Sequence, residues 1–302
     1  MKRPGIGHGF LLVDKEQGWT SHDVVAKVRH LVGGKVGHAG TLDPMATGLL
    51  VLGLGRSTRL LRFVQGFEKE YQATALFGVA TDSLDADGAI LDRSPLPVDP
   101  AQLEAVGERF RGSILQIPPM VSARKVGGKR LYELARAGEV VEREARSVEI
   151  YSLVFTDLAP SDYPEVSFDV ICSTGTYVRA IADDLARALG GRAHLTKLRR
   201  VRNGTLSVSD AVTVDRIETA VADGSIGSLV IDPATALSDI PGIEVEPSYI
   251  PGIRNGVAIP AAILLDGRDG VGEGLVRLLA DGVLLGVYRI DGATAKPEVV
   301  TA

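Results

Sequence analysis

One aspartate stands out because small residues surround it. Asp43 lies in the stretch GHAGTLDPMATGLL, residues 37–50, whose side chains cannot fill a pocket by themselves. Pro44 biases Asp43 toward an extended backbone, and the nearby glycines let the main chain approach a ligand closely. Such a carboxylate is a candidate catalyst, acting as a nucleophile or as a stabiliser of charge. The structural alternative is that Asp43 caps a helix with Pro44 at its first position.

Other catalytic patterns are missing from the sequence. There is no GxxxxGK[ST], no GxGxxG after a strand, and no serine or cysteine nucleophile motif. The five histidines do not fall at metal-ligand spacing. We therefore expect neither a nucleotide cofactor nor a metal, which leaves Asp43 as the catalytic candidate.

Read as a whole, GHAGTLDPMATGLLVLGLG (residues 37–55) resembles the catalytic motif of the TruB family, the bacterial synthases of pseudouridine at position 55 of tRNA. Glu16 stands where that family usually has proline, and Val121 stands where it usually has tyrosine. Further segments resemble the family in the same order: VDKEQGWTSHDVV (13–25), KEYQATALFGVATDSLDADG (69–88), QIPPMVSARKVGGKRLYELARAGEVVEREARSVEI (116–150), CSTGTYVRAIADDLARALG (172–190) and HLTKLRRVRNG (194–204).

The resemblance implies three catalytic residues. Asp43 would be the catalytic aspartate, Arg179 its ion-pair partner, and Tyr71 the ring that stacks on the target base and helps remove the C5 proton. The residues alone allow other interpretations. Tyr71 falls at strand periodicity with apolar residues and is typical of a core, and Arg179 lies four residues before Asp183, the spacing of a surface ion pair.

The resemblance also implies residues that bind RNA. His38 would contact the RNA loop, Tyr177 would belong to the pocket, and Leu198 would form its apolar wall. The implied substrate is uridine in the T-arm of tRNA, flipped out of its stack before reaction, with no guide RNA and no cofactor. Three other functions stay open: an N-ribosyl hydrolase, a catalytically silent RNA-folding factor, and a guide-RNA-dependent rRNA synthase.

Charge is unevenly distributed along the chain. The net charge is −5, yet residues 1–208 carry +3 and the remainder carries −8. Residues 185–204 contain six basic side chains and no acidic one, and Arg199 and Arg200 lie in this run. Such a run suits phosphate contact, although charged runs usually form a solvated face.

Hydrophobic periodicity predicts alternating strands and helices. The first helix, residues 19–33, would be capped by Ser21, and a later helix would be capped by Thr176. The resemblance implies an α+β fold around a mixed, mostly antiparallel sheet. Strands are expected at 9–15, 49–54, 68–78, 113–116, 147–157 and 164–173, and helices at 58–64 and 100–112.

Length and composition suggest two unequal domains in a cytoplasmic protein. A chain of 302 residues with 45% hydrophobic and 24% charged residues can bury a substantial core. No apolar run is long enough to span a bilayer, and a single cysteine suits a reducing compartment. We expect a catalytic domain over 1–240, with a basic excursion near 118–146, and a PUA-like β-barrel over 241–302. We also expect a monomer.

Overall fold

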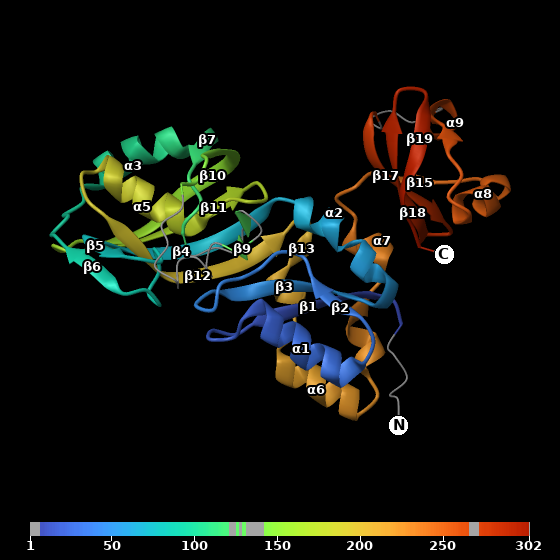
Figure 1. Ribbon diagram of the computed structural model, residues 1–302, viewed down its shortest axis with the longest axis horizontal. Coiled ribbons are helices and arrows are strands. Elements are labelled where there is room, and N and C mark those ends of the chain that lie inside the picture. Colours follow the sequence, from blue (N-terminus) through green and yellow to red (C-terminus); the bar gives the residue numbers. More distant parts are fainter. Residues whose placement is uncertain (1–6, 121–124, 127–128, 131–141, 266–271, 302) are drawn as a thin grey trace.

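A long mixed sheet forms the body of the molecule, and a smaller sheet stands at one end of it (Figure 1). The computed structural model describes residues 7–120, 125–126, 129–130, 142–265 and 272–301. The main sheet has ten strands in the order β14-β1-β3-β12-β4-β11-β10-β7, with β13 added to β12 and β2 added to β3. Their bounds are β1 Gly9–Lys15, β2 Val36–His38, β3 Thr47–Leu54, β4 Lys69–Phe77, β7 Gly112–Gln116, β10 Arg146–Ala159, β11 Glu165–Cys172, β12 Ala193–Asn203, β13 Leu206–Ser207 and β14 Val230–Ile231.

The main sheet is mostly antiparallel, as expected. One parallel contact joins β12 to β3 through Arg199 opposite Thr47 and Arg200 opposite Gly48. This contact brings the basic run beside the strand that follows the Asp43 loop. The alternation expected for β4 is confirmed, since Ala73, Ala75 and Phe77 are buried on the face that Tyr71 shares.

Helices pack on the main sheet in two places. Helix α1 (Ser21–Val32) and helix α6 (Val214–Ala222) lie side by side next to β1 and β3 (Figure 1). Helix α5 (Val178–Ala188) packs on β12 and β4, and helix α3 (Pro100–Gly107) contacts α5 and β10. The apolar face expected for α1 is buried. It contains Val24, Val25, Val28, Leu31 and Val32.

Both predicted helix caps were wrong. The N-cap of α1 is Thr20, which forms a reciprocal capping box with Asp23. Ser21 is instead the first helical residue. Helix α5 begins after Tyr177, which provides no side-chain cap, while the Thr176 hydroxyl donates to the Ser173 carbonyl.

Short elements connect these parts. Two segments that were each predicted as one helix are divided into two short helices in the structure. The segment expected at 58–64 divides into η1 (Gly55–Arg59) and α2 (Leu61–Gly66), and that expected at 100–112 divides into α3 and η2 (Glu108–Phe110). The other connecting elements are β5 Val79–Thr81, β6 Ile90–Arg93, β8 Lys125–Val126, β9 Lys129–Arg130, η3 Val208–Asp210, η4 Ile226–Leu229 and α7 Pro233–Ala236.

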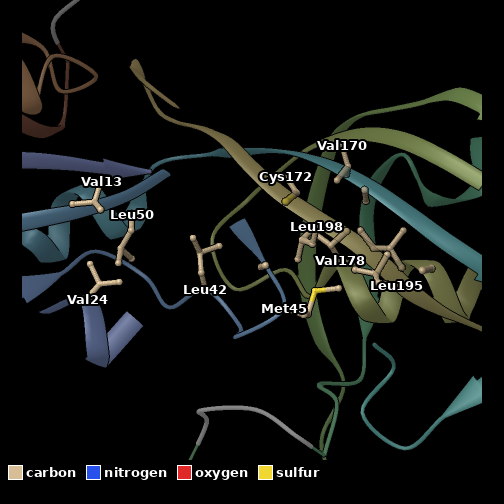
Figure 2. Packing of buried hydrophobic residues seen from close by; sticks show 14 of the residues in the cluster. Val13, Val24, Leu42, Met45, Leu50, Val170, Cys172, Val178, Leu195 and Leu198 are labelled. Carbon is tan, nitrogen blue, oxygen red and sulfur yellow. The ribbon is translucent and has the colours of Figure 1, made fainter. Parts of the chain in front are cut away.

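The residues next to Asp43 are part of the hydrophobic core. Leu42 and Met45 are buried and lie between the group around Val24 and Leu50 and the group around Leu198 (Figure 2). A loop anchored by two buried side chains has little freedom to move. The core therefore fixes where the Asp43 backbone lies.

The C-terminal part forms an open five-stranded sheet in the order β15-β17-β18-β19-β16. The expected hairpin at Asp281 and Gly282 joins β17 to β18 and is confirmed; both residues have positive φ, as a type I′ turn requires. Within the described residues, the end strands β15 and β16 do not pair with each other. The elements are β15 Gly242–Glu244, η5 Pro247–Tyr249, α8 Ile250–Arg254, β16 Ile259–Pro260, α9 Ala261–Leu265, β17 Gly274–Ala280, β18 Val283–Asp291 and β19 Thr294–Val300.

A shared apolar cluster joins the two sheets. Val287 and Val299 of the C-terminal sheet belong to the same buried cluster as Leu60 and Phe63. At this boundary the Arg62 guanidinium pairs with the carboxylate of Glu298 at 2.8 Å. The smaller sheet is therefore attached through packing as well as through the chain.

Candidate active site

Asp43 lies in a turn between β2 and β3. No helix begins at Pro44; Ala46 donates its N–H to the Asp43 carbonyl at 3.1 Å, and β3 follows. The expectation that Asp43 is only a helix cap was therefore wrong. The Ser21 hydroxyl donates to the Leu42 carbonyl at 3.1 Å and accepts the Leu42 N–H at 2.8 Å. Helix α1 thus holds the residue before the aspartate by both of its main-chain groups.

Lys15 holds the other side of the turn. Its side chain is fully buried, and its ammonium donates to the carbonyls of Trp19 at 2.7 Å and Pro44 at 3.3 Å. Burial lowers the pKa of Lys15 to about 8, against the opposing effect of the Asp43 charge. No role for this residue was predicted from its motif, and its contacts fix the main chain directly after Asp43.

Gly48 explains how the turn can lie against β12. Its φ is +97°, and a Cβ at this position would lie 2.3 Å from the Arg200 carbonyl oxygen. Only glycine permits this backbone conformation and this approach. The parallel contact between β3 and β12 therefore depends on Gly48.

Arg179 is shared between two carboxylates. It is 3% exposed; its Nε lies 2.9 Å from Oδ2 of Asp43, and its Nη1 lies 3.0 Å from Oδ2 of Asp85. The same Nη1 donates to the Ser83 carbonyl at 2.7 Å. The structure thus contains the expected pair with Asp43, while Asp183 pairs instead with other arginines. Asp85 was not identified from the sequence as a site residue.

Burial raises the pKa of the Asp43 carboxyl. The Arg179 charge opposes this effect without cancelling it, and the Asp85 charge adds to it. About a third (34%) of the Asp43 side chain remains exposed, so its other face is open to a ligand. The pairing implied by the resemblance would keep Asp43 ionised. In the structure, burial of the Asp43 carboxyl has the larger effect on its pKa and acts in the opposite direction.

Tyr71 lines the same cavity as Asp43. Burial raises the pKa of its phenol, and the Arg200 guanidinium, which shares a hydrogen bond with it, opposes this rise. The phenol is therefore protonated near neutral pH. Tyr71 also packs against the core cluster. Its position therefore agrees with both interpretations, a core side chain and a side chain of the site.

The opposite wall of the cavity is formed by Tyr177, Leu198 and the start of α5. The buried Gln116 amide accepts the Tyr177 N–H at 2.7 Å and donates to the Tyr177 carbonyl at 3.0 Å. Leu198 is 8% exposed and presents an apolar surface. Gln116 therefore fixes the tyrosine main chain on which the wall depends, a role with no local sequence signal.

The cavity enclosed by these groups has a volume of about 250 Å³. It is smaller than most drug-sized ligand sites, whose volumes begin near roughly 300 Å³, and suits a single nucleobase with its sugar. The lining residues are Gly40, Thr41, Leu42, Asp43, Gln65, Lys69, Tyr71, Ser173, Thr174, Gly175, Thr176, Tyr177, Val178, Arg179, Leu198 and Arg200.

Two of the predicted site residues lie outside this cavity. His38 ends β2 and packs edge-on against His22 with ring centroids 5.5 Å apart; burial and the His22 charge lower the pKa of His38. Arg199 points to the other face of β12 and pairs with Asp14 at 2.8 Å. Arg200, by contrast, lines the cavity and is 1% exposed.

The basic run at 185–204 is largely paired with acids from other segments. Arg187 and Arg192 both bind Asp183, and Arg202 binds Glu70. The sequence shows no acid inside the run, but the fold brings acids to it. Neither the phosphate-binding nor the solvated-face interpretation anticipated this pairing. In the basic excursion expected near 118–146, the side chains of Lys125, Lys129 and Arg130 lie outside the described residues, as does Arg124.

The described ranges contain neither a group of residues arranged to hold a metal ion nor a helix that could span a membrane. There, no group of three or more histidine, cysteine, aspartate or glutamate side chains is arranged to hold a metal ion. Within the same ranges no helix has both the length and the apolar character to cross a membrane.

The fold of this chain is shared by chains in solved H/ACA ribonucleoprotein structures. The crystal structure of the archaeal box H/ACA sRNP Nop10-Cbf5 complex contains a chain with the same fold: the TM-score is 0.75 at 24% identity, covering 99% of this chain and 88% of that one. A chain in the structure of H/ACA RNP bound to a substrate RNA containing 2'-deoxyuridine also gives a TM-score of 0.75, at 22% identity, covering 97% and 85% of the two chains.

The chain belongs to the TruB family. Residues 27–178 match the TruB family pseudouridylate synthase N-terminal domain, and residues 179–237 match the tRNA pseudouridylate synthase B C-terminal domain. The tRNA pseudouridine synthase B of Ralstonia pickettii (strain 12J) is 40% identical over 298 residues, which cover 96% of this chain and 93% of that relative. The protein of that name from Thermobifida fusca (strain YX) is 49% identical over 219 residues, covering 70% and 75%.

Proposed function

We propose that the chain isomerises uridine to pseudouridine at position 55, in the T-arm loop of tRNA. The observation that carries this proposal is the Asp43 to Arg179 ion pair, which opens onto a cavity walled by Tyr71 and Leu198 in a member of the TruB family. The tRNA substrate follows from the names of the relatives, tRNA pseudouridine synthase B.

The reaction breaks the C1′–N1 bond and forms a C5–C1′ bond. The proton on C5 leaves, and N1 gains one, so atoms and electrons balance without a redox step. Asp43 acts at C1′ as a nucleophile or as a stabiliser of positive charge. Arg179 orients the carboxylate, and its charge favours the ionised form that either role needs.

Tyr71 stacks on the flipped base and assists transfer of the C5 proton. Because the phenol rests in its protonated state, it can act only as a relay, accepting the C5 proton on oxygen while its own hydrogen passes along a hydrogen bond to a second acceptor. Tyr177 and Leu198 close the cavity, which keeps the detached uracil in place and excludes water from C1′.

His38 and Arg199 are proposed RNA contacts beyond the cavity. The buried Nδ1 of His38 has no hydrogen-bond partner in the described part of the chain, and Arg199 remains 37% exposed beside Asp14. Arg200 would act from within the cavity. We propose that the chain uses bare tRNA without a guide RNA or a cofactor, and that it is a cytoplasmic monomer.

We further propose that the chain divides into a catalytic domain at 1–240 and a PUA-like module at 241–302. The separate five-stranded sheet and its own buried cluster support this division. Residues 241–302 carry eight acidic and five basic side chains, a net charge of −3, which disfavours strong phosphate binding by the module.

The test is incubation of the purified chain with an unmodified tRNA transcript, followed by mapping of pseudouridine. The proposal expects one modified site, at position 55, without any added RNA. Free uracil as the product would indicate an N-ribosyl hydrolase. Binding without any product would indicate an RNA-folding factor. A requirement for an added guide RNA would indicate a guide-RNA-dependent rRNA synthase.

A further inference from the structure

Lys69 is a buried cation at the cavity for which the proposed reaction has no use. It begins β4, two residues before Tyr71, so both side chains lie on the same face of the strand. It is 5% exposed and lines the cavity. Its ammonium donates to the main-chain carbonyls of Gln65 and Phe67, which leaves one N–H available.

Arg200 is a second buried cation on the same floor. Its guanidinium donates to the carbonyls of Leu49 at 2.7 Å and Gly40 at 3.2 Å, and it shares a hydrogen bond with Tyr71. The charge of Arg200 acts on Lys69, so the two cations lie close enough to repel each other. Both cations thus donate to main-chain carbonyl oxygens.

No carboxylate balances this pair among the residues that the structure describes. Other arginines of the sheet have acids, as Arg179 has Asp43 and Arg199 has Asp14. Buried charges are normally paired, because an unpaired charge loses its hydration. Two uncompensated cations beside an open cavity therefore indicate that an anionic ligand completes the site.

A neighbouring side chain also lacks partners. Asn203 lies directly opposite Lys69 across β12 and β4 and is fully buried, yet neither amide atom has a hydrogen-bond partner among the described residues. Buried amides are normally satisfied. Asn203 does not itself line the cavity, so this unsatisfied amide lies beside Lys69 in the sheet rather than at the cavity surface.

We infer that Lys69 and Arg200 form an anion-binding floor that holds negative charge on the flipped nucleotide. The inference rests on the proposed function. That charge has two sources within one nucleotide: its phosphodiester, which is always charged, and its uracil ring, which becomes anionic when the C1′–N1 bond breaks and the electron pair stays on the ring. Both sources need the same chemistry, a fixed cation in a site shielded from water.

The test compares Lys69→Gln, which removes the charge, with Lys69→Arg, which keeps it. Charged hydrogen bonds predict that Lys69→Gln lowers kcat/KM roughly 10- to 100-fold, and Lys69→Arg should retain most of the activity. Lys35→Gln, which removes an exposed lysine, is the matched control and should stay near wild type. Melting temperatures of all three variants show whether the fold is intact.

A T-arm stem-loop with neutral methylphosphonate linkages at the target nucleotide separates the two sources. If Lys69 binds the phosphodiester, the loss lies in affinity and disappears on the neutral analogue. If it stabilises the uracil anion, the loss lies in the single-turnover rate and persists on the analogue. A folded Lys69→Gln variant with unchanged kcat/KM overturns the inference, as does a folded Lys69→Arg variant that is no better than Lys69→Gln.

The alkaline pH profile provides a test that does not require Lys69→Gln to fold. Burial, followed by the Arg200 charge, lowers the pKa of Lys69 to about 8, so its charge is lost as pH rises through that value. Cys172, which faces Lys69, and Tyr71 lose their protons at higher pH, because burial raises the pKa of Cys172 to about 11 and also raises the pKa of Tyr71. Lys15, however, also has a pKa of about 8, so the wild-type profile alone does not separate the two lysines.

Comparing the pH profiles of wild type and Lys69→Arg therefore shows how much of the fall in kcat/KM at high pH comes from Lys69. The wild-type kcat/KM should fall above pH 8, and part of this fall should move to higher pH in Lys69→Arg. A limb that does not move overturns the inference. A wild-type chain that makes no pseudouridine at any pH would instead contradict the proposed function.

Discussion

A single guanidinium held between two carboxylates determines the electrostatics of the site. Arg179 contacts Asp43 on its solvent-accessible side and Asp85 on its buried side. The second carboxylate fixes the direction of the guanidinium, but its charge also raises the pKa of Asp43. Asp85 is thus a positioning residue whose two effects are separable by experiment.

Replacing Asp85 with Asn should move the acidic limb of the pH profile of kcat to lower pH. The pKa of Asp43 is raised in the fold, so activity that needs its carboxylate is lost as pH falls through that raised value; removing a neighbouring negative charge lowers it. The plateau rate should also decrease, because Arg179 loses an anchor. Asp87→Asn is the control, since the effect of the Asp87 charge on Asp43 is smaller. An acidic limb that stays at its wild-type position would exclude this electrostatic role.

Replacing Tyr71 with Phe should separate stacking from proton transfer. The ring remains while the hydroxyl is lost, so tRNA affinity should hold while turnover falls by at least 10²-fold, the lower range for a general acid or base. Tyr71→Leu should also weaken binding, because base stacking on an aromatic ring is worth roughly 1–3 kcal/mol. Turnover, affinity and melting temperature should be measured on both variants. Wild-type turnover by Tyr71→Phe would remove the hydroxyl from the mechanism.

The sequence identified those site residues that lie in recognisable motifs. Asp43, Tyr71 and Arg179 were found in this way, and the structure places all three at one cavity. Asp85 and Lys69 were missed because their significance comes from contacts through space. Asp85 lies 94 residues from the arginine that it holds, and such a pairing has no periodic signal.

At the scale of secondary-structure elements, β12 organises the site. It supplies Leu198 and Arg200 to the cavity and Arg199 to the other face, and it joins β3 to β4. The sequence indicated a basic run here but not the strand, because Lys197, Arg199, Arg200 and Arg202 interrupt the apolar alternation that marks a strand. The strands that alternate cleanly, such as β4, were predicted with nearly correct bounds.

Gln116 offers a test of how β7 and α5 are joined at the cavity wall. Replacing it with Leu leaves the Tyr177 N–H without its partner, while the Tyr177 carbonyl still accepts the N–H groups of Ala180 and Ile181. A buried main-chain group left unsatisfied costs about 1–3 kcal/mol, so melting temperature and kcat should both decrease. Gln116→Glu retains one acceptor for the Tyr177 N–H and should be the milder change. If kcat of a folded Gln116→Leu variant equals that of wild type, Tyr177 needs no such support.

At the scale of the whole molecule, the two sheets depend on each other for burial. The division near residue 240 stays a prediction; the first strand of the C-terminal sheet, β15, begins at Gly242. The sequence did not predict that Val287 and Val299 would join the apolar cluster around Leu60. Contacts between segments more than 200 residues apart cannot be read from local patterns.

Deleting residues 241–302 should therefore lower the melting temperature, because apolar surface of the catalytic part becomes exposed. Each large apolar side chain that loses its burial costs roughly 1.5–3 kcal/mol. Chemistry at saturating tRNA should persist below the new melting temperature, since every cavity residue precedes the cut. Arg62→Ala removes the contacts with the Glu298 carboxylate and carbonyl and with the Phe63 ring but exposes no large apolar side chain, so it should change stability much less. A folded but inactive truncated chain would show that the C-terminal sheet contributes to the site.

The central claim is that the Asp43 carboxylate performs the isomerisation. The most direct measurement is tritium release from tRNA labelled at C5 of its uridines, under single turnover, with wild type and Asp43→Asn. Asparagine keeps the shape and loses the charge, so affinity for tRNA should stay within a few-fold while tritium release and pseudouridine at position 55 disappear. Tritium release by Asp43→Asn at a rate comparable to wild type would contradict the claim.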